Sequence, residues 1–234
     1  MTDRQGGRPH PPWNRPVHPP LQPLLRRLAF AAFALSCLAI AGHAFAYLYQ
    51  GWNPRNPFHV GFATAGWPVP AHFFAAGLAL VLAPVQYLSG LRRRWPRLHR
   101  ASGWLYVAAV LIGGVSGLLL APRAQGGPAN AFNFALLSLL WLAFTGLAIR
   151  HAIAGRLEAH RRWMLRSIAL TFAAVTLRVY LGLGIAVLGL PFDTAYLAAA
   201  WLCWPVNLLV CEWLLRGPLR SAAGRPPAFR PAAA

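Results

Sequence analysis

Six long apolar stretches, separated by short arginine-bearing segments, constrain this chain more than any other feature. A helix needs about 20 predominantly apolar residues to cross the hydrocarbon core of a bilayer. Each stretch is close to that length or exceeds it. The sequence therefore predicts an all-α fold, an integral membrane bundle of six transmembrane helices, near residues 28–47, 69–88, 102–120, 132–149, 163–188 and 195–215.

Composition agrees with this class of protein. Hydrophobic residues make up 57% of the chain and charged residues 11%, whereas ordinary soluble domains have roughly 45–50% and roughly 25%. The formal net charge of +18 would suit a nucleic-acid-binding protein, but here the charges lie between apolar spans and not along one face of a soluble fold. We therefore expect the lipid bilayer, and no nucleic acid, as a partner.

The distribution of arginine predicts the orientation of the bundle. All 22 basic residues are arginine, and 19 of them fall on the side of the two termini. Only Arg55 and Arg123 fall on the other side, and Arg178 lies inside the fifth span. Because basic residues remain in the cytoplasm, both termini should be cytoplasmic in a multi-pass protein of the bacterial inner membrane.

Both ends of the chain differ in composition from the spans. We expect residues 1–23 to form a disordered proline-rich cytoplasmic tail, residues 24–216 the transmembrane domain, and residues 217–234 a disordered basic tail. An alternative concerns the first span, because Ala44-Phe45-Ala46 resembles a signal-peptide cleavage site. Cleavage there would leave five spans and remove His43.

Arg178 is the most conspicuous polar residue, since a charge within a membrane span needs a reason to be there. The nearest carboxylate on the next span, Glu212, lies about eight residues deeper, roughly 12 Å along a helix. Two interpretations follow. Arg178 bonds Asn207 and backbone carbonyls as a structural contact, or it faces a cavity and holds an anion, which could be a substrate, a lipid phosphate or a cofactor carboxylate.

The histidines near the span ends form two groups by depth. His43 and His72 form an outer pair, while His99 and His160 lie at the inner ends of two other spans, with His151 nearby. Two histidines on different helices at one depth can ligate a haem iron from both sides, and an arginine such as Arg178 can neutralise a haem propionate. The four paired histidines are therefore candidate haem b ligands.

Other observations favour different chemistry. The inner histidines lie beside arginines at the headgroup region, which suits anionic lipid headgroups at the cytoplasmic face. No histidine, cysteine or carboxylate spacing indicates a metal site other than a possible haem iron. No catalytic set of residues is visible, so enzymatic activity stays open. A weak repeat of Arg97–Arg100 at Arg156–Arg161 would place His99 and His160 at equal depth.

Three motifs resemble a known family. They are His72-Phe73-Phe74-Ala75-Ala76-Gly77, then Leu98-His99-Arg100-Ala101-Ser102-Gly103-Trp104-Leu105-Tyr106, then His160-Arg161-Arg162-Trp163-Met164-Leu165-Arg166-Ser167 followed by Val175-Thr176-Leu177-Arg178. Over about Ala71 to Leu190 the chain resembles the uncharacterised domain-of-unknown-function family 2306. The resemblance implies a multi-pass bacterial inner-membrane protein and supplies no catalytic residues. Helix count and histidine placement are also similar, by analogy only, to haem b cytochromes of the b561 type.

These observations leave three functional hypotheses. The first is a haem b protein that passes electrons, with His43 and His72 as one ligand pair and His99 and His160 as the other. The second is a transporter or lipid-handling protein that binds an anionic group at Arg178. The third is a structural or assembly subunit. Protein partners, the oligomeric state and the substrate are not indicated by the sequence.

Overall fold

The fold is a bundle of helices, seen in a computed structural model that describes residues 21–50 and 57–217. Within these residues there is no strand, and six helices are long and apolar enough to cross a membrane. The predicted fold class is therefore confirmed. The long helices are α1 (Leu21–Tyr49), α3 (Pro68–Tyr87), α5 (Pro96–Leu120), α6 (Gly127–Ile153), the consecutive α7 (Leu157–Thr171) and α8 (Ala173–Ala186), and α9 (Phe192–Arg216).

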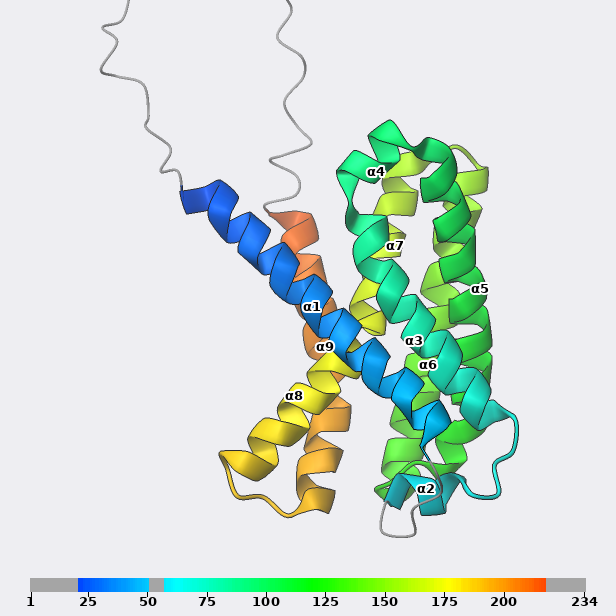
Figure 1. Ribbon diagram of the computed structural model, residues 1–234, viewed down its shortest axis with the longest axis vertical. Helices are drawn as coiled ribbons and strands as arrows, with labels where there is room; N and C mark the ends of the chain where they lie inside the picture. Colours follow the sequence, from blue (N-terminus) through cyan, green and yellow to red (C-terminus); the bar gives the residue numbers. More distant parts are fainter. Residues whose placement is uncertain (1–20, 51–56, 218–234) are drawn as a thin grey trace, which may run out of the picture.

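Short helices occupy the connections at the two ends of the bundle. These are α2 (Pro57–Phe62), α4 (Ser89–Arg94) and a 3-10 helix (Ala121–Arg123). Figure 1 shows α1 beginning and α9 ending at the same end of the molecule as α4. We call this the arginine-rich end, because α4 and the turn between α6 and α7 carry exposed arginines there, and we call the other end the opposite end. The cytoplasmic location of the arginine-rich end stays a prediction, and the predicted tails lie almost entirely outside the described residues.

The centre of the bundle is formed by α3, α5, α6 and α7. Tyr106 and Val110 of α5 are almost completely buried there. Glycines on α5 bring the helices together: a Cβ atom on Gly114 would lie 2.7 Å from the side chain of Leu142. In lipid, helix association depends on such close packing, because moving apolar surface from lipid into a helix interface gives no net hydrophobic stabilisation. Small residues therefore lie at the helix–helix interfaces of this bundle, as they usually do in membrane proteins.

Helix α1 crosses the bundle obliquely (Figure 1) and packs mainly on α3. Its buried face carries Cys37, Ala41 and Ala44. Phe45 fills the space over Gly77 of α3, where a Cβ atom would lie 2.8 Å from the ring. This span is thus integrated into the bundle by shape as well as by hydropathy.

The fifth span is interrupted at Phe172, although its sequence predicted one continuous helix. Figure 1 shows α8 turning away from the axis of α7. In an uninterrupted helix, the carbonyl of Ala169 would accept a hydrogen bond from the amide of Ala173. Here that carbonyl accepts a bond of 3.1 Å from Nδ2 of Asn207 on α9. The hydroxyl of Thr176 also bonds backwards to the carbonyl of Phe172, a contact that bends helices.

An ion pair joins α7 to α9 nearer the arginine-rich end. Nε of Arg166 donates to Oε1 of Glu212 at 2.6 Å, and Nη2 donates to Oε2 at 3.1 Å. The Arg166 guanidinium also lies 4.6 Å from the ring centroid of Trp163. This bidentate geometry is the strong form of an arginine–carboxylate contact, and it fixes α9 against α7 between the break and the arginine-rich end.

Candidate ligand-binding cavity

A cavity of about 400 Å³ lies in the half of the bundle toward the opposite end. Its wall receives side chains from α1, α3, α5, α6, α7, α8 and α9, and most of the lining is apolar. Ligand sites in proteins have this character, with a few polar groups placed in an otherwise apolar wall. The polar members of this wall are therefore the candidate functional residues.

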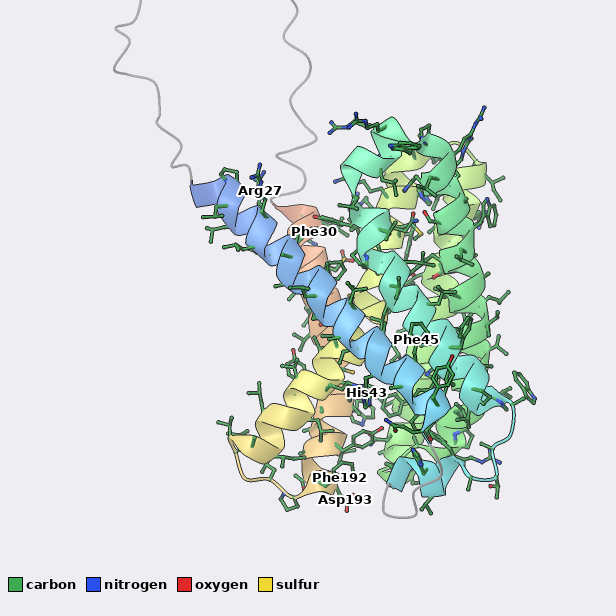
Figure 2. The ribbon with its side chains drawn as sticks, viewed as in Figure 1. Arg27, Phe30, His43, Phe45, Phe192 and Asp193 are labelled. Carbon is green, nitrogen blue, oxygen red and sulfur yellow. The ribbon has the colours of Figure 1, made fainter. Side chains whose placement is uncertain are left out.

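Three of the residues singled out in the sequence meet at this cavity: His43 from α1, His72 from α3 and Arg178 from α8. Arg178 is close enough to both imidazoles for its charge to act on each of them. Figure 2 shows His43 on the side of α1 that faces α8 and α9. The chain thus gathers two histidines and one arginine that are up to 135 residues apart in sequence.

Arg178 has no carboxylate partner among the described residues. Glu212 pairs with Arg166, Glu158 lies 4.0 Å from Arg161, and Asp193 is exposed at the start of α9. Nη1 of Arg178 donates a hydrogen bond of 2.8 Å to the carbonyl of its own helix at Ala174. The predicted carbonyl contact is therefore present.

The predicted contact between Arg178 and Asn207 does not form. Nδ2 of Asn207 instead donates to the carbonyl of Ala169 and to the hydroxyl of Thr176, both at 3.1 Å. Asn207 thus satisfies backbone and hydroxyl groups at the break in the fifth span. This leaves most N–H donors of the Arg178 guanidinium available to the cavity, because a guanidinium carries five.

The tautomer of His72 is set by the backbone of α5. Its Nδ1 lies 2.9 Å from the carbonyl oxygen of Gly113, and a carbonyl only accepts, so Nδ1 carries the proton. In the neutral ring Nε2 is then the atom with the free lone pair. Gly117 makes this position possible, because a Cβ atom there would lie 3.0 Å from Cε1 of His72.

His43 stands at the rim of the cavity. It lines the cavity and is also exposed, which indicates that the cavity opens on the flank of α1. The adjacent wall is aromatic: the rings of Tyr47 and Phe73 stack with centroids 3.9 Å apart and an interplanar angle of 7°. The rim therefore combines a polar imidazole with flat apolar surfaces.

The inner histidines lie apart from this cavity, in the first turns of α5 and α7. His99 and His160 are near enough to interact electrostatically, and His151 is a further neighbour of His160. Nδ1 of His160 donates to the carbonyl of Ala148 at 2.9 Å. Nδ1 atoms of His99 and His151 are buried and lack a hydrogen-bond partner among the described residues. Within residues 21–50 and 57–217, no group of three or more potential metal ligands converges.

Several polar residues of the cavity were not singled out in the sequence. Tyr196 lies near Arg178, and Ser138, Trp141 and Thr171 also line the wall. Thr171 and Trp141 are hydrogen-bonded to each other at 3.0 Å. Their signal in the sequence is faint, because serine, threonine and tryptophan are common in membrane helices. Only Trp141 and Thr171 recur four residues from another polar residue, Thr145 and Ser167 respectively, which marks one face of each helix.

The fold and the cavity define a multi-pass α-helical membrane protein with a largely apolar internal site. Residues 69–215, more than half of the chain, match the family described as a predicted membrane protein (DUF2306). The chain belongs to that family, as its motifs indicated. No curated protein and no solved structure matches it.

Proposed function

We propose that this protein binds an amphiphilic anion, with the charged group at Arg178 and the apolar part in the cavity, and handles or transports that molecule in the membrane. The observation that carries the proposal is the Arg178 guanidinium in an apolar cavity wall, without a carboxylate partner among the described residues. A buried charge is costly unless it is paired. An anionic ligand would supply the missing pair.

The remaining polar groups of the wall support the same chemistry. With Nδ1 held by Gly113, His72 offers Nε2 to a ligand, and His43 stands at the rim. The stacked rings of Tyr47 and Phe73 provide a flat surface for an acyl or isoprenoid chain. A carboxylate and a phosphate both fit a guanidinium in bidentate geometry, so the two head groups are to be compared directly.

Binding of a fluorescent long-chain fatty acid to the protein in nanodiscs tests this proposal. Arg178→Gln should weaken binding roughly 10- to 100-fold, as expected when a charged hydrogen bond worth about 1.5–3 kcal/mol is lost. Arg123→Gln, which changes an exposed arginine of the 3-10 helix, should leave binding unchanged. The methyl ester of the same fatty acid should bind weakly, because it carries no charge. Comparing the affinity of the fatty acid with that of an alkyl phosphate of equal length shows which head group the site prefers. Equal binding of acid and ester, or of wild type and Arg178→Gln, would refute the proposal.

A second candidate function is electron transfer through haem b, and the tautomer of His72 favours it. Ligating histidines commonly donate one ring N–H to a backbone carbonyl and bind the metal through the other nitrogen. His72 meets this condition through Gly113, and His43 lies on another wall of the same cavity. Arg178 would be available to neutralise a propionate. Bound haem would supply one-electron chemistry, while these residues would hold and orient it.

The inner pair fits haem less well. The cavity does not reach His99 or His160, although Nε2 of His160 is left free by the bond from Nδ1 to Ala148. An absorption spectrum of protein expressed with ample haem decides between the sites. A Soret band that His72→Ala abolishes and His160→Ala leaves unchanged would support the cavity site. Absence of the band in the wild type would exclude the redox hypothesis.

We also propose that the arginine-rich end contacts anionic lipid headgroups at the cytoplasmic face of a bacterial inner membrane. Arg92, Arg93 and Arg94 of α4 are all exposed there, as are Arg150 in the last turn of α6 and Arg156 in the turn that follows. Clustered arginines next to membrane spans attract anionic lipids at about 1 kcal/mol per residue.

A further inference from the structure

Four hydroxyl groups form a continuous hydrogen-bonded chain in the centre of the bundle. Oγ1 of Thr171 lies 2.7 Å from the Tyr106 hydroxyl, which lies 2.9 Å from Oγ of Ser167. Ser167 in turn lies 2.7 Å from Oγ1 of Thr145. All four residues are buried and come from α5, α6 and α7. We call this set the hydroxyl chain.

The hydroxyl chain can be fully hydrogen-bonded in two opposite orientations. In the first orientation, Thr171 donates to Tyr106, and Tyr106 donates to Ser167. Ser167 then donates to Thr145. Thr145 donates to the carbonyl of Trp141 at 2.8 Å. In the other, every donation between side chains is reversed. Thr171 then donates to the carbonyl of Ser167 at 3.0 Å. Each hydroxyl donates its single proton in both cases, so neither orientation leaves a buried donor without an acceptor.

The two ends of the hydroxyl chain lie at different places in the membrane. Thr171 belongs to the wall of the cavity, together with its partner Trp141. Thr145 lies toward the arginine-rich end, three residues or about 4.5 Å of helix rise before Ala148. The carbonyl of Ala148 holds Nδ1 of His160, whose Nε2 carries the free lone pair of the neutral ring. The hydroxyl chain thus leads from the cavity toward a titratable histidine.

A purely structural role explains this arrangement poorly. Hydrogen bonds between membrane helices add little net stability, and an apolar residue would fill each of these positions without any donor to satisfy. A structural network also needs only one satisfied orientation. Two satisfied orientations are the property that a proton path requires, because each transfer reverses the direction in which the hydroxyls donate.

We propose that the hydroxyl chain conducts protons between the cavity and His160. A hydronium ion in the cavity gives a proton to Thr171 and becomes water, while the original Thr171 proton passes to Tyr106. The same exchange follows at Ser167 and Thr145, and Thr145 releases its proton through bridging water to Nε2 of His160. Every oxygen ends neutral with one proton, and no electron moves. Rotation about the C–O bonds restores the first orientation.

Proton flux into liposomes that enclose a pH-sensitive dye tests the proposal, with a potassium gradient and valinomycin setting the membrane potential. We expect flux above that of protein-free liposomes. Tyr106→Phe and Thr145→Val, which remove one hydroxyl each at nearly constant shape, should lower the initial rate at least tenfold. Ser36→Ala removes a hydroxyl that bonds the carbonyl of Phe33 on α1 and should not change the rate.

Folding of each variant is checked by circular dichroism and by size-exclusion chromatography, and Thr145→Val decides the matter if Tyr106→Phe does not fold. Flux equal to that of protein-free liposomes, or equal flux in wild type and both variants, would overturn the proton path. Fatty-acid binding, which depends on Arg178, should be retained in Tyr106→Phe. Failure of the proton path and failure of the anion site are therefore distinguishable.

Discussion

At the scale of single residues, the position of the His72 ring depends on the absence of a side chain at Gly117. A Cβ atom there would lie 3.0 Å from Cε1 and 3.1 Å from Nδ1 of the ring, and 3.0 Å from Oγ of Ser138. The bond from His72 to the carbonyl of Gly113 needs that space. The geometry of the cavity therefore rests on a residue that carries no chemistry itself.

Gly117→Ala should accordingly destabilise the protein. Overpacking in a closely packed interior costs typically about 1–3 kcal/mol, and we expect a loss of that size in the free energy of unfolding, measured in mixed micelles. Gly182→Ala is the matched control, because no atom lies within 4 Å of a Cβ at that position. It should be neutral or stabilising by up to about 1 kcal/mol, since alanine favours helix. Equal effects of the two substitutions would show that the close approach is unimportant.

The sequence identified Arg178, His43 and His72 because polar residues within apolar spans are few and costly. It could not place them in one cavity, since hydropathy gives depth but not the direction in which a side chain points. It also misjudged Asn207, which has the right depth for Arg178 but bonds Ala169 instead. Choosing between two hydrogen-bond partners of Asn207 at one depth requires the rotation of α9 about its axis, and composition carries no such information.

At the scale of helices, the number and order of the spans followed from hydropathy alone. Helix bounds did not: α5 and α7 each begin six residues before the predicted spans, at Pro96 and Leu157. Hydropathy ends where arginines begin, whereas backbone hydrogen bonding continues into the headgroup region. The break at Phe172 was also not predicted, because the bond from Asn207 that accompanies it comes from another helix.

The ion pair between α7 and α9 gives a prediction at this scale. Glu212→Gln removes the bidentate partner of Arg166 and should lower the free energy of unfolding by about 1.5–3 kcal/mol, the range for hydrogen bonds to charged groups. Glu158→Gln serves as the control, because its 4.0 Å contact with Arg161 joins side chains that are 70% and 41% exposed. Such exposed pairs contribute about 0–1 kcal/mol. A loss for Glu158→Gln as large as that for Glu212→Gln would contradict this account.

At the scale of the whole molecule, the orientation of the bundle can be checked directly. Both described ends of the chain lie at the arginine-rich end (Figure 1). The excess of arginine on that side predicts that it faces the cytoplasm. A reporter that works only in the cytoplasm should be active when it is fused after Arg94. A reporter that works only in the periplasm should be active when it is fused after Gly126. The reverse pattern would invert the assignment of every loop.

The proposed contact with anionic headgroups predicts a lipid dependence of stability. The thermal unfolding midpoint should be higher in phosphatidylglycerol than in phosphatidylcholine bilayers, and 1 M salt should reduce the difference, because the Debye length is then about 3 Å. Replacing Arg92, Arg93 and Arg94 together by glutamine should also reduce it. Arg123→Gln, at the opposite end, should not. A midpoint independent of lipid charge would exclude the contact.

The exposed position of His43 on the flank of a membrane-spanning helix has a consequence for how affinity is defined. For a solute that enters sideways from the acyl region, occupancy of the protein depends on the mole fraction of the solute in the membrane. That mole fraction falls when more lipid is added to the same total amount of solute. Half-saturation expressed per litre of buffer should therefore rise with the lipid-to-protein ratio, while half-saturation expressed per lipid stays constant. Very hydrophobic solutes would then saturate the protein at vanishing aqueous concentration.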